Sequence, residues 1–365
     1  MHVPSIFRPR ISSLASRTIV NKDWVDFILG HFSSTLRINR IHARVEAVRD
    51  ETADMKTFSL RPNALWPGFR PGQFVPLAVV IDGVRHERYY SLVSRPDDSR
   101  IAFSVKRQHR GLVSSWCHEH VAVGDTVELG VPSGNFVLPS SPRSLLLIAG
   151  GSGITPIYSL VQAAVAADPE CDITLLYYAR NPQDFAFQRE LSDIALAHAS
   201  VNIFFLPEQG DMGGLRGRFH TEHLRAMAPD YADRLAYVCG PGGLMDAVET
   251  CWKEEGLHDR LRLERFGTPT PSQRLSDPAT AQEVPVHFQR SQVTGIHDRT
   301  NLLDTAERAG LRPAHGCRMG ICRTCVCTKI SGSVRNVTTG EEDHADNSRI
   351  RICVSEPIGP VTLDL

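Results

Sequence analysis

The spacing of hydrophobic residues divides the chain into segments of different character. Between about residues 38 and 140, short runs such as Ile41–Val48 and Lys56–Leu60 alternate apolar and polar residues, and glycine and proline separate them. Residues that alternate in this way point to opposite faces of a strand. Because the runs are regularly spaced and no long helical pattern interrupts them, they predict about six strands of an antiparallel β-barrel over residues 38–140.

From Ser144 the pattern changes to strands that alternate with helices. A continuous apolar run spans Leu145–Ala149, a helix is predicted to begin near Thr155, and further apolar runs lie at 173–178, 201–206 and 235–239. Strands that are apolar throughout are typical of a parallel sheet covered on both faces. We therefore expect an α/β parallel-sheet domain over residues 141–267.

The two ends of the chain are predicted to carry further units. Residues 268–284 are rich in Pro, Ser, Thr, Gln and Ala, which favours a linker, and 285–365 form a small domain with a short helix at 301–309 closed by Gly310. An amphipathic helix is predicted over 23–36, within an N-terminal helical extension of residues 1–37. That helix could pack on the domain behind it or dock a partner, and it lacks the basic face that anionic lipid favours.

Composition narrows the class of protein. The chain has 365 residues, 42% of them hydrophobic and 22% charged, with a net charge of -1, so nothing global favours nucleic acid. No stretch approaches the ~20 apolar residues of a membrane span. Residues 1–22 carry several arginines and no acid, which faintly resembles a transit peptide, but they lack the apolar core of a secretory signal. The nine cysteines are an odd number, and five of them show no pairing pattern, which favours a reducing, cytoplasmic location: Cys117, Cys171, Cys239, Cys251 and Cys327.

Four cysteines have the spacing of a metal centre. Cys317, Cys322 and Cys325 form a C-x4-C-x2-C loop, and Cys353 lies further along. Thiolates bind zinc or iron–sulfur clusters. Structural zinc sites usually use two separate pairs, whereas three cysteines in one loop and a distant fourth are the plant-type 2Fe-2S spacing, so the cluster is favoured over zinc or plain structural cysteines. Gly316 and Gly320 allow backbone amides to reach the sulfurs, and Cys327 is predicted not to be a ligand.

Two glycine-rich segments end strands of the predicted parallel sheet. Gly150–Pro156 follows the first strand and Tyr237–Gly243 contains a later strand end. Glycines let the backbone approach a pyrophosphate, and ligands bind at the carboxyl ends of such strands. In the barrel, Arg88 and Tyr90 share one face of a strand and Ser91 the other, a pattern that suits a phosphate and a flat ring. Residues 111–115 begin a helix that either binds an anion or is simply capped.

In this order, the motifs resemble the ferredoxin–NADP reductase superfamily, and the cysteine loop resembles the plant-type ferredoxins with their β-grasp fold. The whole is similar to iron–sulfur flavoprotein reductases of oxygenase and desaturase systems. The resemblance implies FAD rather than FMN, because FMN relatives carry a denser Gly-Arg-Gly-Gly stretch at 110–114. It also implies cofactor contacts by a set of residues: Arg88 for the flavin phosphate, Tyr90 and Ser91 for the isoalloxazine, Gly111, Val113 and Ser114 for the pyrophosphate, Gly151, Gly153, Thr155, Cys239, Gly240 and Pro241 for the nicotinamide dinucleotide, and Glu264 and Phe266 for a segment that closes on the flavin.

The expected activity follows from the order of the cofactors. A nicotinamide gives two electrons together, a 2Fe-2S cluster takes one, and a flavin belongs between them. The partner would be an oxygenase, a desaturase or a haem monooxygenase, and no catalytic nucleophile or base is needed. Arg180, joined by Arg189, follows the second parallel strand and favours NADPH over NADH, although Arg180 could be a solvated surface residue. A reductase of a separate soluble carrier and a redox sensor are the alternatives.

Overall fold

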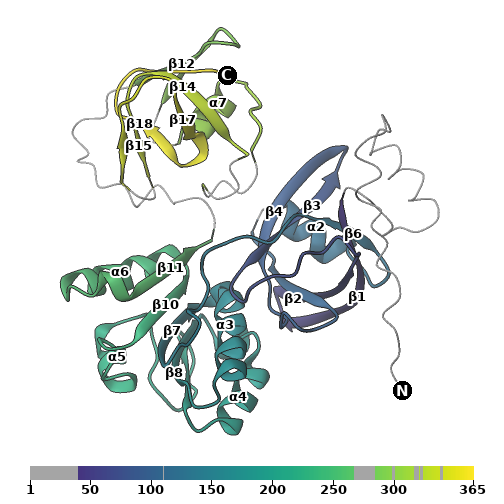
Figure 1. Cartoon of the computed structure of the whole chain (residues 1–365), viewed down its shortest axis with the longest axis vertical. Helices are drawn as coiled ribbons and strands as arrows, with labels where there is room; N and C mark the ends of the chain where they lie inside the picture. The colour runs from purple at the N-terminus through teal and green to yellow at the C-terminus, as the bar shows by residue number, and fades with distance from the viewer. Residues whose placement is uncertain are drawn as a thin grey trace, which may run out of the picture.

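The computed structural model describes residues 40–109, 111–266, 284–297, 301–315, 320, 324–337 and 340–365. Figure 1 shows three lobes, built around an antiparallel sheet, a parallel sheet and a pair of small sheets. The predicted helix over 23–36 and nearly all of the predicted linker lie outside the described residues. No helix within the described ranges is both long and apolar enough to cross a membrane.

The first lobe is the predicted antiparallel barrel. Its strand order is β4-β3-β6-β1-β2-β5, and an isolated bridge between Leu92 and Phe103 joins the two edges. Alternation in the first strand buries Ala43 and Val45 and exposes Arg44. The elements are β1 (Ile41–Thr52), β2 (Met55–Pro62), β3 (Phe74–Ile81), β4 (Val84–Ser91), β5 (Ile101–Lys106), α2 (Leu112–His120) and β6 (Thr126–Leu129).

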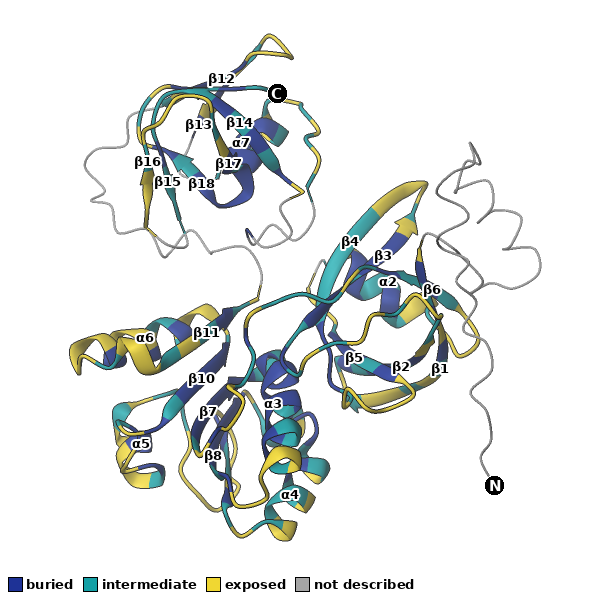
Figure 2. Ribbon diagram, in the orientation of Figure 1, coloured by how far each residue is buried: buried dark blue, intermediate teal, exposed yellow. Residues whose placement is uncertain are grey.

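The second lobe is the predicted parallel sheet, with strand order β11-β10-β7-β8-β9. Alternate residues of the first strand enter different cores: Leu145 and Leu147 face the core beneath α3, and Leu146 and Ile148 face the core beneath α6. Figure 2 shows the strands buried between these layers. The elements are β7 (Ser144–Gly150), α3 (Ile154–Ala167), β8 (Asp172–Ala179), α4 (Gln188–Ala197), β9 (Val201–Pro207), α5 (Thr221–Met227), β10 (Leu235–Gly240), α6 (Gly242–Glu254) and β11 (Leu261–Arg265).

The first two lobes share a core. Met55, Val93 and Phe136 of the barrel segment pack with the side chains around α3. Two hydrogen bonds also cross the boundary, from Tyr237 Oη to the carbonyl of residue 137 (2.8 Å) and from Gln162 Nε2 to the carbonyl of Val93 (2.9 Å). The antiparallel and parallel lobes are therefore held in one arrangement by apolar contacts as well as hydrogen bonds.

The third lobe has the predicted small α+β architecture. Its sheets have the orders β13-β12-β19-β14-β17 and β16-β15-β18. Asn301 caps the helix, because its side-chain oxygen accepts from the Asp304 amide at 2.9 Å. The elements are β12 (Val284–Phe288), β13 (Val293–His297), α7 (Leu302–Arg308), β14 (Val326–Ser331), β15 (Val334–Asn336), β16 (Glu342–Asp343), β17 (Ser348–Arg351), β18 (Ser355–Pro357) and β19 (Val361–Leu363).

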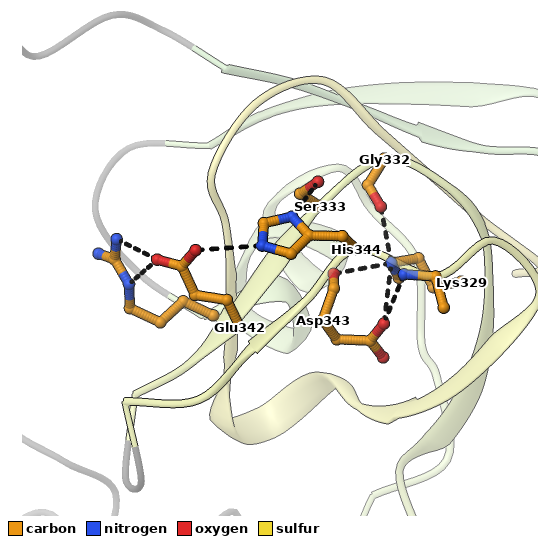
Figure 3. Close-up of polar contacts among 8 residues, drawn as sticks. Lys329, Gly332, Ser333, Glu342, Asp343 and His344 are labelled. Carbon is orange, nitrogen blue, oxygen red and sulfur yellow. Dashed lines mark hydrogen bonds and ion pairs between the residues drawn. The ribbon is translucent and has the colours of Figure 1, made fainter.

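A buried lysine ties the two small sheets of this lobe together (Figure 3). Lys329 on β14 is 0% exposed, and its Nζ donates to the carbonyls of Gly332 (2.6 Å) and Asp343 (2.9 Å). The Asp343 carboxylate lies 3.4 Å from the same Nζ. Beside it, His344 contacts Ser333 Oγ through Nδ1 (2.9 Å). Sequence reasoning gave no sign of this cluster, because lysine is rarely buried.

Candidate functional site

The predicted flavin motif lies at the end of β4. Arg88 and Tyr90 pair with Leu77 and Val75 of β3, so both point to the same face of the sheet as expected. The Tyr90 ring stacks on Phe103, with 5.5 Å between ring centroids and 14° between planes. Burial raises the pKa of the Tyr90 hydroxyl, which therefore stays protonated. Ser91 Oγ is buried and has no hydrogen-bond partner among the described residues.

The predicted pyrophosphate loop begins α2. Ser114 Oγ accepts from the Gln108 amide (3.1 Å) and donates to the Gly111 carbonyl (3.3 Å), so it organises the turn. A Cβ at Gly111 would lie 2.4 Å from that hydroxyl, which leaves room for glycine alone. Val113 is buried beneath the helix, and no side chain caps the first turn within the described residues. Its amides are thus available to an anion.

The two glycine-rich segments lie against each other. β7 and β10 are neighbours, with Ala149 paired to Cys239, so both strand ends reach the same edge of the sheet. A Cβ at Gly153 would lie 2.1 Å from the Cys239 carbonyl oxygen, and one at Gly240 would lie 3.0 Å from the Gly150 amide. Gly151 has φ +52° and open space beside it. The structure therefore brings the predicted dinucleotide residues together, including Pro241, whose Cδ would lie 2.7 Å from a Cβ at Gly150.

Thr155 and Cys239 are buried at this edge. Thr155 Oγ1 donates to the Ser152 carbonyl at 3.0 Å, which holds the turn into α3. Cys239 is fully buried, and burial raises the pKa of its thiol. Its neighbour in the parallel register on β11 is Glu264. Burial raises the pKa of the Glu264 carboxyl to about 8, so it is mostly uncharged at neutral pH.

Glu264 Oε2, like Ser91 Oγ, is buried without a hydrogen-bond partner among the described residues. Buried polar atoms without partners are rare, because each costs about 1–3 kcal/mol. Glu264 lies at the glycine-lined edge and Ser91 at the end of β4, so the two atoms fit a bound nicotinamide and a bound flavin, which would supply the missing partners. Phe266 follows Glu264 at the end of β11 and is 40% exposed, a position from which an aromatic ring can cover a flat ligand.

The predicted 2′-phosphate residues differ in their surroundings. Arg180 is exposed directly after β8, and its carbonyl accepts from the Gln209 amide at 2.8 Å, which ties it to the end of β9. Arg189 is 91% exposed and lies 3.9 Å from Asp193 on its own helix. Sequence reasoning missed Arg216 and Arg218, which follow β9, although the glycine- and arginine-rich run Gly213–Arg218 was a readable signal.

Two of the four predicted cluster cysteines lie among the described residues. Cys325 and Cys353 are 3% and 1% exposed, and the Ile352 amide donates to the Cys325 carbonyl at 3.3 Å, so the two chain segments are adjacent. Cys317 and Cys322 lie outside the described residues, within which no group of three potential ligands occurs. The Gly320 amide donates to Cys353 Sγ at 3.3 Å, the contact that a cluster thiolate favours.

Cys327 is placed as a non-ligand would be. Its Sγ lies 3.4 Å from the carbonyl of Thr328 and 3.7 Å from that of Asp364. Burial raises the pKa of this thiol to about 11, so it stays protonated, whereas metal ligands are thiolates.

Comparison with known proteins decides the family. Three family models match in succession: an oxidoreductase FAD-binding domain (residues 42–138), an oxidoreductase NAD-binding domain (147–250) and a 2Fe-2S iron-sulfur cluster binding domain (286–357). An NADPH oxidoreductase of Mycobacterium tuberculosis is 33% identical over 89% of this chain and 84% of its own length. The chain belongs to the ferredoxin–NADP reductase-type flavoproteins with a 2Fe-2S domain.

Other relatives of this reductase include oxygenase components. The glycine betaine monooxygenase reductase subunit of Chromohalobacter salexigens is 32% identical, over 89% of this chain and 95% of its own. Among solved structures, phthalate dioxygenase reductase has the same fold, with a TM-score of 0.60 at 24% identity over 90% of this chain and 98% of its own. The predicted fold class, the FAD, nicotinamide and 2Fe-2S domains, and the NAD(P)H-dependent reductase activity are confirmed. The individual site residues stay predictions.

Proposed function

We propose that this reductase takes electrons from NADPH and delivers them singly to an oxygenase component. The observation that carries the proposal is the succession of FAD, nicotinamide and 2Fe-2S domains in one chain, shared with a monooxygenase reductase subunit over most of both lengths. FAD held by the first lobe would supply the conversion of a two-electron donation into single electrons, which a one-electron cluster requires. We also propose that its domains span 38–140, 141–267 and 285–365.

The role of the chain's own residues would be to bind and orient the flavin and the nicotinamide. Arg88 and the amides in the first turn of α2 would hold the flavin phosphates, and Tyr90 would pack beside the ring system. Cys239 and Thr155 would line the nicotinamide pocket at the edge where the two glycine-rich segments meet. Glu264, protonated at neutral pH, can donate a hydrogen bond there without bringing a negative charge next to the electron donor.

Arginines at the ends of β8 and β9 support NADPH over NADH. Arg180, Arg216 and Arg218 follow these strands, where a ribose 2′-phosphate would lie. Two acids lie near Arg180, and both carboxylates already have partners: Asp184 accepts from the Asn181 amide (3.1 Å) and side chain (2.9 Å). Glu208, whose amide donates to the Ala179 carbonyl at 2.8 Å, accepts from Arg218 Nε at 3.3 Å. The relative from Mycobacterium tuberculosis is an NADPH oxidoreductase.

An oxygenase is favoured over a desaturase or a haem monooxygenase as the acceptor. Relatives at 32% identity include the reductase component of a glycine betaine monooxygenase and one component of a 1,2-phenylacetyl-CoA epoxidase of Escherichia coli. The cytoplasm is the proposed location, because Cys117, Cys171, Cys239, Cys251 and Cys327 form no disulfide in the part of the chain that the structure describes.

The test is an anaerobic reaction of the holoprotein with NADPH and, separately, NADH. We expect flavin absorbance to bleach faster with NADPH, followed by the electron paramagnetic resonance signal of a reduced 2Fe-2S cluster. Product formation with candidate oxygenase components would then identify the acceptor. Flavin that does not bleach with either nucleotide would overturn the proposal and favour a redox sensor. Reduction only through an added soluble carrier would favour the carrier reductase instead.

A further inference from the structure

Gly320 is clamped between two parts of the third lobe. Its amide donates to Cys353 Sγ at 3.3 Å, and its carbonyl accepts from Arg351 Nη1. It has φ +74°, and a Cβ at this position would lie 2.8 Å from Val354 Cγ2. Residue 320 must therefore be glycine. Its amide is held by Cys353 Sγ and its carbonyl by the Arg351 guanidinium.

Arg351 is in a position to control that amide. It is the last residue of β17, two residues before Cys353, and it pairs with Val326, which follows Cys325 on β14. Backbone pairing between β14 and β17 fixes the backbone of Arg351, and its half-buried side chain reaches the carbonyl of Gly320. Arg349 carries the same charge on the same strand but is exposed, and it pairs through its backbone with Thr328 of β14.

We infer that Arg351 is a positioning residue that raises the reduction potential of the 2Fe-2S cluster. It holds the carbonyl of the same residue whose amide donates to Cys353 Sγ, so that the amide stays directed at the sulfur and a positive charge lies on the opposite side of Gly320. Hydrogen bonds to the sulfurs and nearby cations both stabilise the reduced state, which carries one more negative charge. The inference rests on the proposed electron route, because plant-type clusters near about -400 mV accept electrons poorly from most flavins.

The test compares three variants of the full-length holoprotein. Arg351→Gln removes the charge, Arg351→Lys keeps it with a different donor geometry, and Arg349→Gln is the matched control for loss of one positive charge from the same strand. Iron and acid-labile sulfide are measured per chain. The cluster midpoint potential is measured by a dithionite titration followed by low-temperature electron paramagnetic resonance, which does not depend on turnover.

We expect Arg351→Gln to retain iron and sulfide while its potential falls. At a fixed applied potential the ratio of reduced to oxidised cluster should drop up to about tenfold, which is ~59 mV for a one-electron couple. Arg351→Lys should lie between this variant and the unaltered protein, and Arg349→Gln should shift by clearly less than Arg351→Gln.

Two results would overturn the inference. One is an Arg351→Gln protein with full iron content and the potential of Arg349→Gln. The other is loss of iron in both Arg351 variants with an unchanged potential in the clusters that remain, which would show a structural role only. Bleaching of the flavin by NADPH is recorded in parallel. Its failure in the unaltered protein would remove the proposed function but would leave the dithionite measurement of Arg351 intact.

Discussion

Glu264 shows how burial sets the chemistry of one residue. A carboxyl that is 8% exposed, with one oxygen lacking a partner among the described residues, holds its proton to a pKa of about 8. The folded apoprotein therefore binds one more proton than the unfolded chain between about pH 4.5 and 8. Its stability is favoured at the low end of this window and is lost as the pH rises through 8.

We predict that Glu264→Gln reduces this loss of stability. The change in unfolding free energy between pH 6 and pH 9 should be smaller in the variant, with each unit of pKa shift worth about 1.4 kcal/mol. Urea unfolding of the apoproteins at the two pH values measures it. Glu254→Gln, an exposed change on α6, is the control and should follow the unaltered protein. Identical pH dependence in all three proteins would show that Glu264 is ionised in the folded state.

A substitution at Gly153 would test the contact between the two glycine-rich segments. Alanine there would place its Cβ 2.1 Å from the Cys239 carbonyl oxygen, so one of the two strand ends must move. We predict at least tenfold weaker NADPH binding for Gly153→Ala and a lower melting temperature, measured by titration and by calorimetry. Gly359→Ala is the control, because it lies outside both glycine-rich segments and no atom lies within 4 Å of its Cβ position in the described structure. Equal binding by both variants would contradict the predicted site.

At the scale of elements, Lys329 joins strands that pair only weakly. β16 has two residues and β15 three, so their attachment to β14 depends on the Lys329 contacts with Gly332 and Asp343. Lys329→Met would leave two carbonyl acceptors without their donor and remove the cation beside the Asp343 carboxylate, which keeps the Ala345 amide at 2.9 Å. We predict a loss of about 2–4 kcal/mol in unfolding free energy. Lys253→Met, at an exposed helix position, should have little effect. Thermal unfolding followed by the cluster's visible absorbance separates the two variants; equal melting would show that water replaces the lysine.

The sequence predicted elements that depend on local patterns better than it predicted contacts between residues far apart in the chain. Local patterns were sufficient for β1, where Ala43, Arg44 and Val45 alternate, and for the wholly apolar β7. The contact between the glycine-rich segments followed from the rule that parallel strand ends share an edge. Met55 and Phe136, by contrast, looked like barrel residues and pack in the core around α3, because that contact joins segments far apart in sequence. Buried Lys329 was missed, since no local pattern marks a lysine for burial. Arg216 and Arg218 were missed although glycine and arginine are concentrated in the run Gly213–Arg218.

At the scale of the whole molecule, the first two lobes form a single structural unit because they share a hydrophobic core. Met55, Val93 and Phe136 cross between them, and Arg49 of β1 pairs with Glu190 of α4. The hydrophobic core of the third lobe is different: every described residue in it lies between positions 286 and 365. Electron transfer within the first two lobes and transfer out through the third lobe should therefore be separable.

We predict that a chain ending at residue 266 still oxidises NADPH. It keeps all three apolar cores of the first two lobes, so it should bind FAD and reduce ferricyanide at a rate within about threefold of the full-length protein, since the barrel and parallel sheet bury their cores without the third lobe. It lacks the four predicted cluster cysteines, so turnover of the oxygenase partner should be lost. Full partner turnover by the shortened chain would show that electrons leave from the flavin directly. Loss of ferricyanide reduction with FAD still bound would show instead that the third lobe helps to form the nicotinamide site.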